Sequence, residues 1–141
     1  MASVLLVDDQ PSILNVISVL LKAEGYDVTP VRSGDAAIEL IKSQKFDLMI
    51  SDINMRPVDG MELLKLAREA QPSMSVLMIT GYGSVETAVE AMKLGAFDYV
   101  TKPFKVPELL ITVKRALEYN KAISENVDLK AKLNSRCRIE N

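Results

Sequence analysis

Five short apolar runs recur along the chain, and a segment with the periodicity of an amphipathic helix follows each of them. We predict β-strands at 4–7, 28–31, 48–51, 76–79 and 97–100. Parallel neighbouring strands need a crossover connection, which is usually a helix. The alternation therefore predicts an α/β fold, with one parallel sheet covered by helices on both faces.

Local signals refine this pattern at several points. The run Tyr26-Asp27-Val28-Thr29 alternates in polarity, which favours an edge strand with one wet face. Pro11 suits the first turn of a helix, and Gly25 suits a left-handed cap at its end. Ser33 is a candidate N-cap for the second helix. We expect the first helix to bury one apolar face, formed by Ile13, Ile17, Leu20 and Leu21.

Two further helices show different apolar faces. The third predicted helix follows Asp59-Gly60 and should direct Leu63, Leu64 and Ala67 inward. The fourth begins near Ser84 and ends at Gly95. Its face consists mainly of small residues, which bury less area, so we expect this helix to move more easily than the others. The residues of this face are Val85, Ala88, Val89, Ala91 and Met92.

Composition excludes several classes of function. The 141 residues include no histidine and a single cysteine, which rules out a disulfide framework, a zinc finger and a histidine-assisted nucleophile. The net charge of −2 argues against direct nucleic-acid binding. No apolar run reaches the ~20 residues that a membrane span requires, and the start of the chain does not resemble a secretion signal. We expect a cytoplasmic protein.

The C-terminal part of the chain differs from the rest. We predict a single domain over 1–120 and a helical extension over 121–141, because the helix that follows Pro107 becomes polar from Lys121 onward. The last residues have no helical period, which is typical of a disordered or artificial tail. A heptad pattern in the extension is polar, so a solvated linker is as good an interpretation as a coiled coil. We nonetheless hypothesise a homodimer through the last helix and its extension.

Polar residues follow the predicted strands at their carboxyl ends, where ligands bind in sheets of this kind. Asp8-Asp9 follows the first strand and Asp52 the third, while Thr80 follows the fourth and Lys102 comes soon after the fifth. We expect these side chains to converge. Three crowded carboxylates repel one another unless a hard cation neutralises them. Magnesium suits an all-oxygen site that contains no histidine or cysteine.

A site of this composition suits phosphoryl transfer. Asp52 can act as the nucleophile, while Mg²⁺ and Lys102 offset the charge of the phosphoryl oxygens and Thr80 donates a hydrogen bond. Taken singly, each residue has a plainer interpretation. An Asp pair after a strand is common in turns and helix caps, and most lysines are simply solvated. The combination favours the functional interpretation.

Four segments carry a resemblance to a known family: VLLVDD at 4–9, SDINM at 51–55, ITGYGS at 79–84 and DYVTKPF at 98–104. Together they resemble the receiver domain of two-component response regulators, over Val4 to about Leu117. The sequence from 80 to 104 is most similar to that of receivers from NtrC-type, sigma-54-dependent transcriptional activators. The resemblance implies a flavodoxin-like (CheY-like), doubly wound sheet with strand order 2-1-3-4-5.

The same resemblance implies roles for particular residues. Asp52 would be the phosphoacceptor, and Asp8, Asp9, Asp52 and the backbone carbonyl of Asn54 would bind magnesium. Lys102 and Thr80 would contact the phosphoryl group, and Thr80 and Tyr99 would act as switch residues. A sensor histidine kinase or a small phosphodonor would supply the phosphoryl group, and the output would be control of transcription, without enzymatic turnover beyond slow self-phosphorylation and dephosphorylation.

One position departs from the family pattern. Members usually have Met-Pro after the magnesium-binding turn, whereas here Arg56 separates Met55 from Pro57. The loop keeps its length up to Gly60, but its backbone restriction moves by one residue. We expect this shift to affect the orientation of the Asn54 backbone carbonyl, and with it the geometry of the metal site.

Two alternative functions share parts of this pattern. A small phosphohydrolase could also form an aspartyl phosphate, but such enzymes place a second Asp where this chain has Asn54. A flavodoxin-like cofactor binder would need a phosphate-binding loop after the first strand, where two aspartates would instead repel a flavin phosphate.

Overall fold

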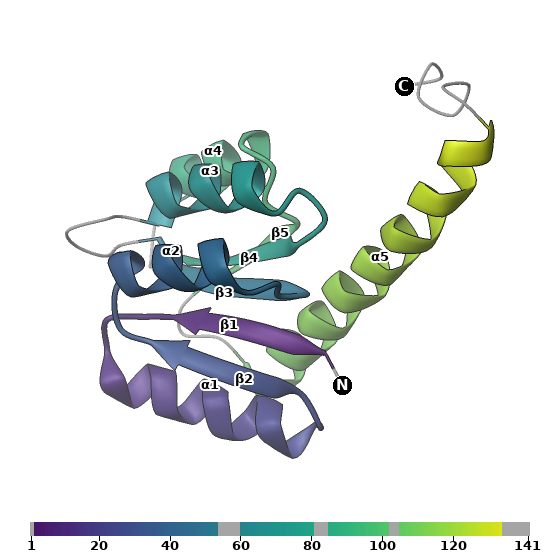
Figure 1. Cartoon of the computed structure of the whole chain (residues 1–141). Helices are drawn as coiled ribbons and strands as arrows, with labels where there is room; N and C mark the ends of the chain where they lie inside the picture. Colours follow the sequence, from purple (N-terminus) through teal and green to yellow (C-terminus); the bar gives the residue numbers. More distant parts are fainter. Residues whose placement is uncertain (1, 54–59, 81–84, 102–104, 134–141) are drawn as a thin grey trace.

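A computed structural model describes residues 2–53, 60–80, 85–101 and 105–133, with the side chains of Val85 and residues 120–133 left aside. Strands and helices alternate through these ranges (Figure 1). The strands are β1 (Ser3–Val7), β2 (Asp27–Val31), β3 (Leu48–Asp52), β4 (Ser75–Thr80) and β5 (Asp98–Thr101). The helices are α1 (Pro11–Ala23), α2 (Gly34–Ser43), α3 (Gly60–Ala70), α4 (Val85–Lys93) and α5 (Val106–Leu133).

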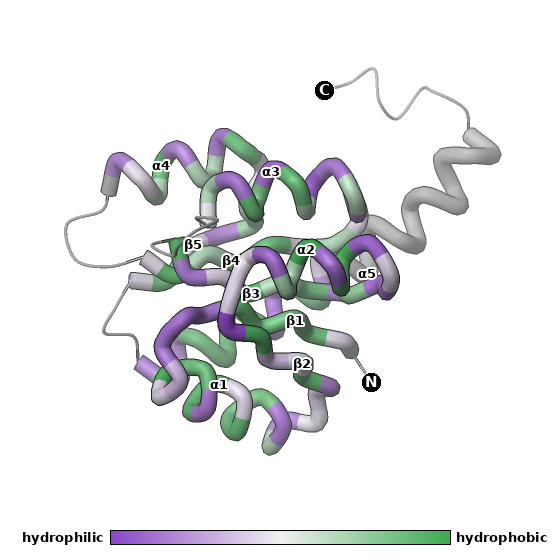
Figure 2. Tube along the Cα trace, turned by 60° about the vertical axis from the view of Figure 1, so that its left-hand side comes forward, coloured by the Kyte–Doolittle hydropathy of each residue, from purple (hydrophilic) through white to green (hydrophobic). Residues whose placement is uncertain are grey.

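The five strands form one parallel sheet in the order β2-β1-β3-β4-β5. This confirms the predicted α/β class and strand order. The side chains of the central strands alternate between two separate cores, as expected for strands buried on both faces. Leu5 and Val7 of β1 pack with α2, α3 and α4, whereas Val4 and Leu6 pack with α1 and α5. The helices show the complementary pattern of polar and apolar stripes (Figure 2).

The edge position of β2 is confirmed. Val28 is buried while Asp27 and Pro30 are exposed, so the polarity alternates as the sequence indicated. Pro30 lies opposite Leu6 in the register with β1 and contributes no backbone N–H to the sheet. At the other edge, β5 begins at Asp98, one residue later than predicted.

The predicted helix ends are also present. The Ser33 hydroxyl accepts a hydrogen bond from the backbone N–H of Ala36 at 3.2 Å, which makes it the N-cap of α2. Gly25 has φ of +93° after α1, the left-handed conformation that favours glycine at this position. The buried face of α1 differs in part from the predicted one, because Leu14 is buried while Ile13 and Leu20 are only half-buried.

The predicted face of α4 is wrong at two positions. Ala88 and Ala91 are buried against the sheet, but Val89 and Met92 are exposed. Among the described side chains of α4, the apolar stripe is therefore narrower than the sequence indicated, and alanines provide its buried positions. Small contact residues bury little apolar area, and the expectation that α4 moves more easily than the other helices stays a prediction.

Helix α5 packs on the sheet through one face and then continues away from the body of the domain (Figure 1). Among the side chains described up to residue 119, its buried positions are Leu109, Thr112, Val113 and Ala116. The helix runs past residue 120 without a break, so the predicted boundary between 1–120 and 121–141 stays a prediction. Within the described ranges, no helix is both long and apolar enough to span a membrane.

A buried glutamine joins two helices at the amino-terminal end of the sheet. The Gln71 side chain accepts a hydrogen bond from the Phe46 N–H at 3.0 Å. It also donates to the carbonyls of Ile41 at 2.9 Å and Gln44 at 2.6 Å. One side chain therefore satisfies three backbone groups near the end of α2 and the start of β3.

We predict that Gln71→Ala lowers the free energy of unfolding by about 2–3 kcal/mol, because it leaves a buried N–H and two carbonyls without their partner. Gln44→Ala, at an exposed position nearby, should change stability by less than about 0.5 kcal/mol. Urea unfolding followed by circular dichroism measures both. Equal effects of the two substitutions would contradict this role of Gln71.

Candidate functional site

The carboxyl ends of β1 and β3 bring three aspartates together. The two strands pair in parallel with Val7 opposite Ser51, so Asp8 and Asp52 occupy the next positions at the same edge of the sheet. Asp8 is 0% exposed and Asp52 3% exposed, whereas Asp9 is open to solvent. One carboxylate oxygen from each of the three lies within 4.8 Å of the others. The predicted convergence of Asp8, Asp9 and Asp52 is confirmed.

Asp8 has two structural functions. Its backbone N–H donates to the carbonyl of Val31 at 3.2 Å, which continues the pairing with β2. Its Oδ1 accepts a hydrogen bond from the backbone N–H of Gln10 at 2.9 Å. The turn interpretation of the Asp pair is thus correct for Asp8, and this same contact orients the carboxylate within the acidic cluster.

The backbone of Asp52 is held by neighbours that sequence analysis did not identify. The buried Ser51 hydroxyl donates to the Asp52 carbonyl at 3.1 Å, and the Gly60 N–H donates to the carbonyl of Ile53 at 2.9 Å. A Cβ atom on Gly60 would collide with the Asp52 carbonyl oxygen and with the Cα of Ile53. Glycine at position 60 therefore lets the start of α3 approach the backbone beside the acidic cluster.

Thr80 ends β4 beside β3. The Ile53 N–H donates to the carbonyl of Ile79 at 3.0 Å, which extends the pairing of the two strands past Asp52. Thr80 is 1% exposed, and its Oγ1 has no hydrogen-bond partner among the described residues. A buried hydroxyl in this state favours a polar ligand, because an unsatisfied buried donor costs about 1–3 kcal/mol.

The remaining predicted site residues divide into two groups. Asn54 and Lys102 lie outside the described residues, as do Arg56 and Pro57 of the departure from the family pattern. Tyr99 is described, and its side chain is exposed on β5. Nothing in this arrangement tests its predicted switching role.

The acidic cluster suits a hard divalent cation. Two buried carboxylates and one exposed carboxylate supply oxygen ligands only, and the exposed one leaves an open side for water or a phosphate oxygen. Burying like charges at this distance costs free energy that a cation would offset. The donor set fits magnesium in chemistry and in number, since Mg²⁺ usually binds through one or two carboxylates and keeps several waters.

Comparison with known proteins identifies the class of this domain. Residues 4–114 match the response regulator receiver domain family. That match covers more than half of the chain, and the chain therefore belongs to the receiver domains of two-component response regulators. The resemblance seen in the sequence is thereby confirmed.

Particular relatives are transcriptional regulators. The chain is 39% identical over 132 residues to a putative NtrX-like response regulator of Rickettsia felis, covering 92% of this chain and 28% of the relative. It is 41% identical over 120 residues to the transcriptional regulatory protein ZraR of Escherichia coli K12, covering 85% of this chain and 27% of the relative. The chain thus spans less than a third of the length of these relatives.

Solved structures show the same fold. NtrX from Brucella abortus superposes with a TM-score of 0.86 at 35% identity, covering 91% of this chain and 29% of that one. A receiver domain from Clostridium thermocellum superposes with a TM-score of 0.82 at 31% identity, covering 87% of this chain and 99% of that one. The second comparison shows that a receiver alone accounts for most of the present fold.

We predict that magnesium raises the melting temperature of the native chain and does not raise that of Asp8→Asn, because the substitution removes a buried charged ligand. At ten times its Kd, a ligand specific for the folded state adds about 1.4 kcal/mol. Calorimetry with and without MgCl2, at ionic strength matched with KCl, measures the shift. Asp35→Asn, on the exposed face of α2, should keep it. An equal shift in Asp8→Asn would contradict the site.

Proposed function

We propose that this domain is a phosphorylation switch in which Asp52 accepts the phosphoryl group and Asp8 and Asp9 bind Mg²⁺ beside it. The observation that carries the proposal is the cluster itself: a nearly buried Asp52 with two further carboxylates whose oxygens lie within 4.8 Å. Membership of the receiver family supports the assignment of a regulatory role.

The chemistry requires little of the protein beyond position and charge. An Asp52 carboxylate oxygen attacks the phosphorus of the donor and forms a new P–O bond. The bond from phosphorus to the donor's leaving nitrogen or oxygen breaks, and the leaving group takes its electron pair. Bound magnesium would supply the positive charge that lets the anionic donor approach the carboxylates.

The other site residues act on the transferred group. Thr80 offers a buried hydroxyl without a partner among the described residues, which suits donation to a phosphoryl oxygen. We assign Lys102 the role of an electrostatic partner, and the carbonyl of Asn54 a place among the magnesium ligands. Both assignments rest on the family resemblance and on their positions after β5 and β3.

The output of the switch follows from the same elements. We assign Thr80 and Tyr99 to the coupling between the phosphorylated site and the surface of α4, β5 and α5. Helix α4 is a suitable element to shift on phosphorylation, since its buried positions among the described side chains are alanines, which bury little apolar area. A sensor histidine kinase would be the donor in the cytoplasm. Names of relatives such as ZraR favour transcription as the process controlled.

We predict that acetyl phosphate labels the native chain in the presence of magnesium, and that Asp52→Asn or chelation of magnesium abolishes the labelling. Phos-tag electrophoresis and intact-mass spectrometry detect the added phosphoryl group. Asp35→Asn should be labelled at the native rate. Full labelling of Asp52→Asn would overturn the assignment, and steady turnover of a phosphate ester would favour the phosphohydrolase alternative.

We also propose that the domain forms homodimers through α5 and its extension, with 1–120 as the receiver and 121–141 as the extension. The face of α5 turned away from its buried positions carries Ile111, a large apolar side chain that is 58% exposed. Such a face on a helix that projects from the body of the domain suits pairing with a second copy.

We predict that Ile111→Glu weakens self-association, because it places a charge on this face. Ile111 is 58% exposed, so the fold should tolerate the change. Val19→Glu is the matched control, since Val19 is 59% exposed on α1. Sedimentation equilibrium, with and without beryllofluoride, measures the dimer. Monomeric behaviour of the native chain at all concentrations would contradict the proposal.

A further inference from the structure

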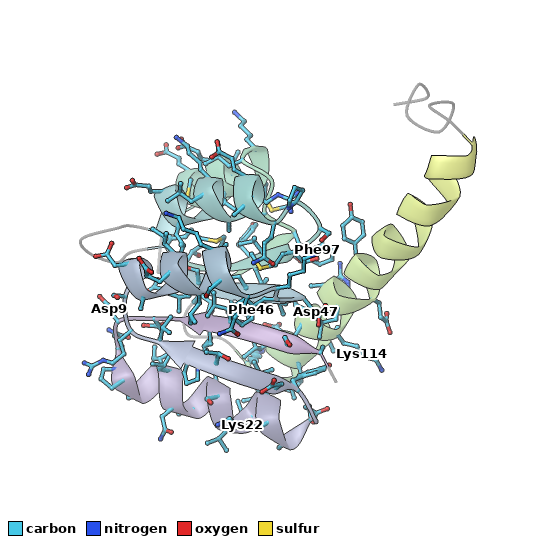
Figure 3. The ribbon with its side chains drawn as sticks, viewed as in Figure 1. Asp9, Lys22, Phe46, Asp47, Phe97 and Lys114 are labelled. Carbon is cyan, nitrogen blue, oxygen red and sulfur yellow. The ribbon has the colours of Figure 1, made fainter. Side chains whose placement is uncertain are left out.

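A cavity lies at the opposite end of the sheet from the acidic cluster. Its volume is about 320 Å³, and it lies between the turn after α3, the turn after α4 and the side of α5. Figure 3 shows the separation, with Asp9 at one end of the sheet and Phe97 beside α5 at the other. The proposed phosphorylation chemistry uses none of the residues that line this cavity.

The cavity contains a half-buried cation without a counter-ion. The Arg68 Nη1 donates to the Met74 carbonyl at 2.8 Å, and no carboxylate forms an ion pair with Arg68 in the described part of the chain. None of the described residues that line the cavity is acidic. A charge removed from water without a partner is costly. The guanidinium has five N–H donors, so it keeps donors for an anion after its contact with Met74.

Arg68 lies close to the backbone of Gly95. Gly95 has φ of +108°, and a Cβ there would lie 3.0 Å from Arg68 Nε. Any larger residue would therefore press on the guanidinium as well as strain the backbone. The absence of a side chain at position 95 leaves space for Arg68 against the turn that follows α4.

Aromatic residues form another part of the lining. The rings of Phe97 and Tyr119 lie with centroids 5.3 Å apart at a tilt of 45°, and the Arg115 guanidinium lies 6.0 Å from the Phe97 centroid. A hydrogen bond of 3.1 Å from the Ser75 hydroxyl to the Ala116 carbonyl fastens β4 to α5 beside them. This part of the lining thus offers aromatic ring surface next to the contact between β4 and α5.

We propose that this cavity binds a small anion that carries a flat ring, with its carboxylate or phosphate on Arg68 and its ring against Phe97 and Tyr119. Bidentate contact with planar anions is the geometry that a guanidinium favours. The volume falls at the lower end of the range for small-molecule sites. The site is independent of Asp52, and it lies where α5 leaves the domain.

The test is an NMR titration of the full chain in EDTA with sodium benzoate and phenyl phosphate. We expect saturable shifts of the amides of Ser73, Gly95 and Phe97, and weaker binding of acetate and of benzyl alcohol, which each carry half of the ligand. Whichever of benzoate and phenyl phosphate binds more tightly identifies the anionic group, carboxylate or phosphate, that the site prefers. Chelation of metal keeps the titration separate from phosphorylation of Asp52.

Variants establish the site. Arg68→Gln should weaken benzoate by about tenfold, the value of one charged hydrogen bond. Lys65→Gln, which removes the same charge from an exposed position on α3, should leave the affinity unchanged. Tyr119→Ala, at an exposed position that the fold should tolerate, should weaken it by about threefold. The proposal would be overturned if benzoate caused no saturable shifts up to about 10 mM. It would also be overturned if Arg68→Gln and Tyr119→Ala both bound benzoate with the affinity of the native chain.

Discussion

The parallel pairing of β1 with β3 is the constraint on which the site depends. Both strands are buried on two faces, so their register cannot slip without exposing one core and burying polar groups in the other. The register that satisfies both cores also carries Asp8 and Asp52 to adjacent positions at the edge of the sheet. The free energy of burying the two apolar cores thus offsets the electrostatic repulsion between the clustered carboxylates.

The two ends of the sheet have different chemistry. At the carboxyl end, the Ser51 hydroxyl and the Gly60 N–H donate to the backbone carbonyls of Asp52 and Ile53, beside carboxylates that suit a cation. At the amino end, Gly95 makes room for a guanidinium that invites an anion. Along the chain, α4 (Val85–Lys93) comes after β4, which ends at Thr80, and before Gly95.

Much of the fold could be predicted from the sequence, because apolar periodicity reports burial directly. The strands, the caps at Ser33 and Gly25 and the meeting of Asp8, Asp9 and Asp52 all follow from local rules. Periodicity could not show that Val89 and Met92 are exposed, since their burial depends on how α4 lies on the sheet. Nor could it show the approach of Gly60 to Asp52 or of Gly95 to Arg68, which only tertiary packing creates. The contributions of Asn54 and Lys102 stay predictions.

The proline at the outer strand has a consequence for assembly. An open sheet edge is a template on which another chain can add a strand, and uncontrolled addition leads to aggregates. Pro30 removes a donor from β2 and places a rigid ring at that edge. A signalling domain must meet its partners repeatedly and release them each time. Because strand addition is blocked at this edge, partners are left with the helical surfaces. Recognition there depends on side chains and not on unpaired backbone groups.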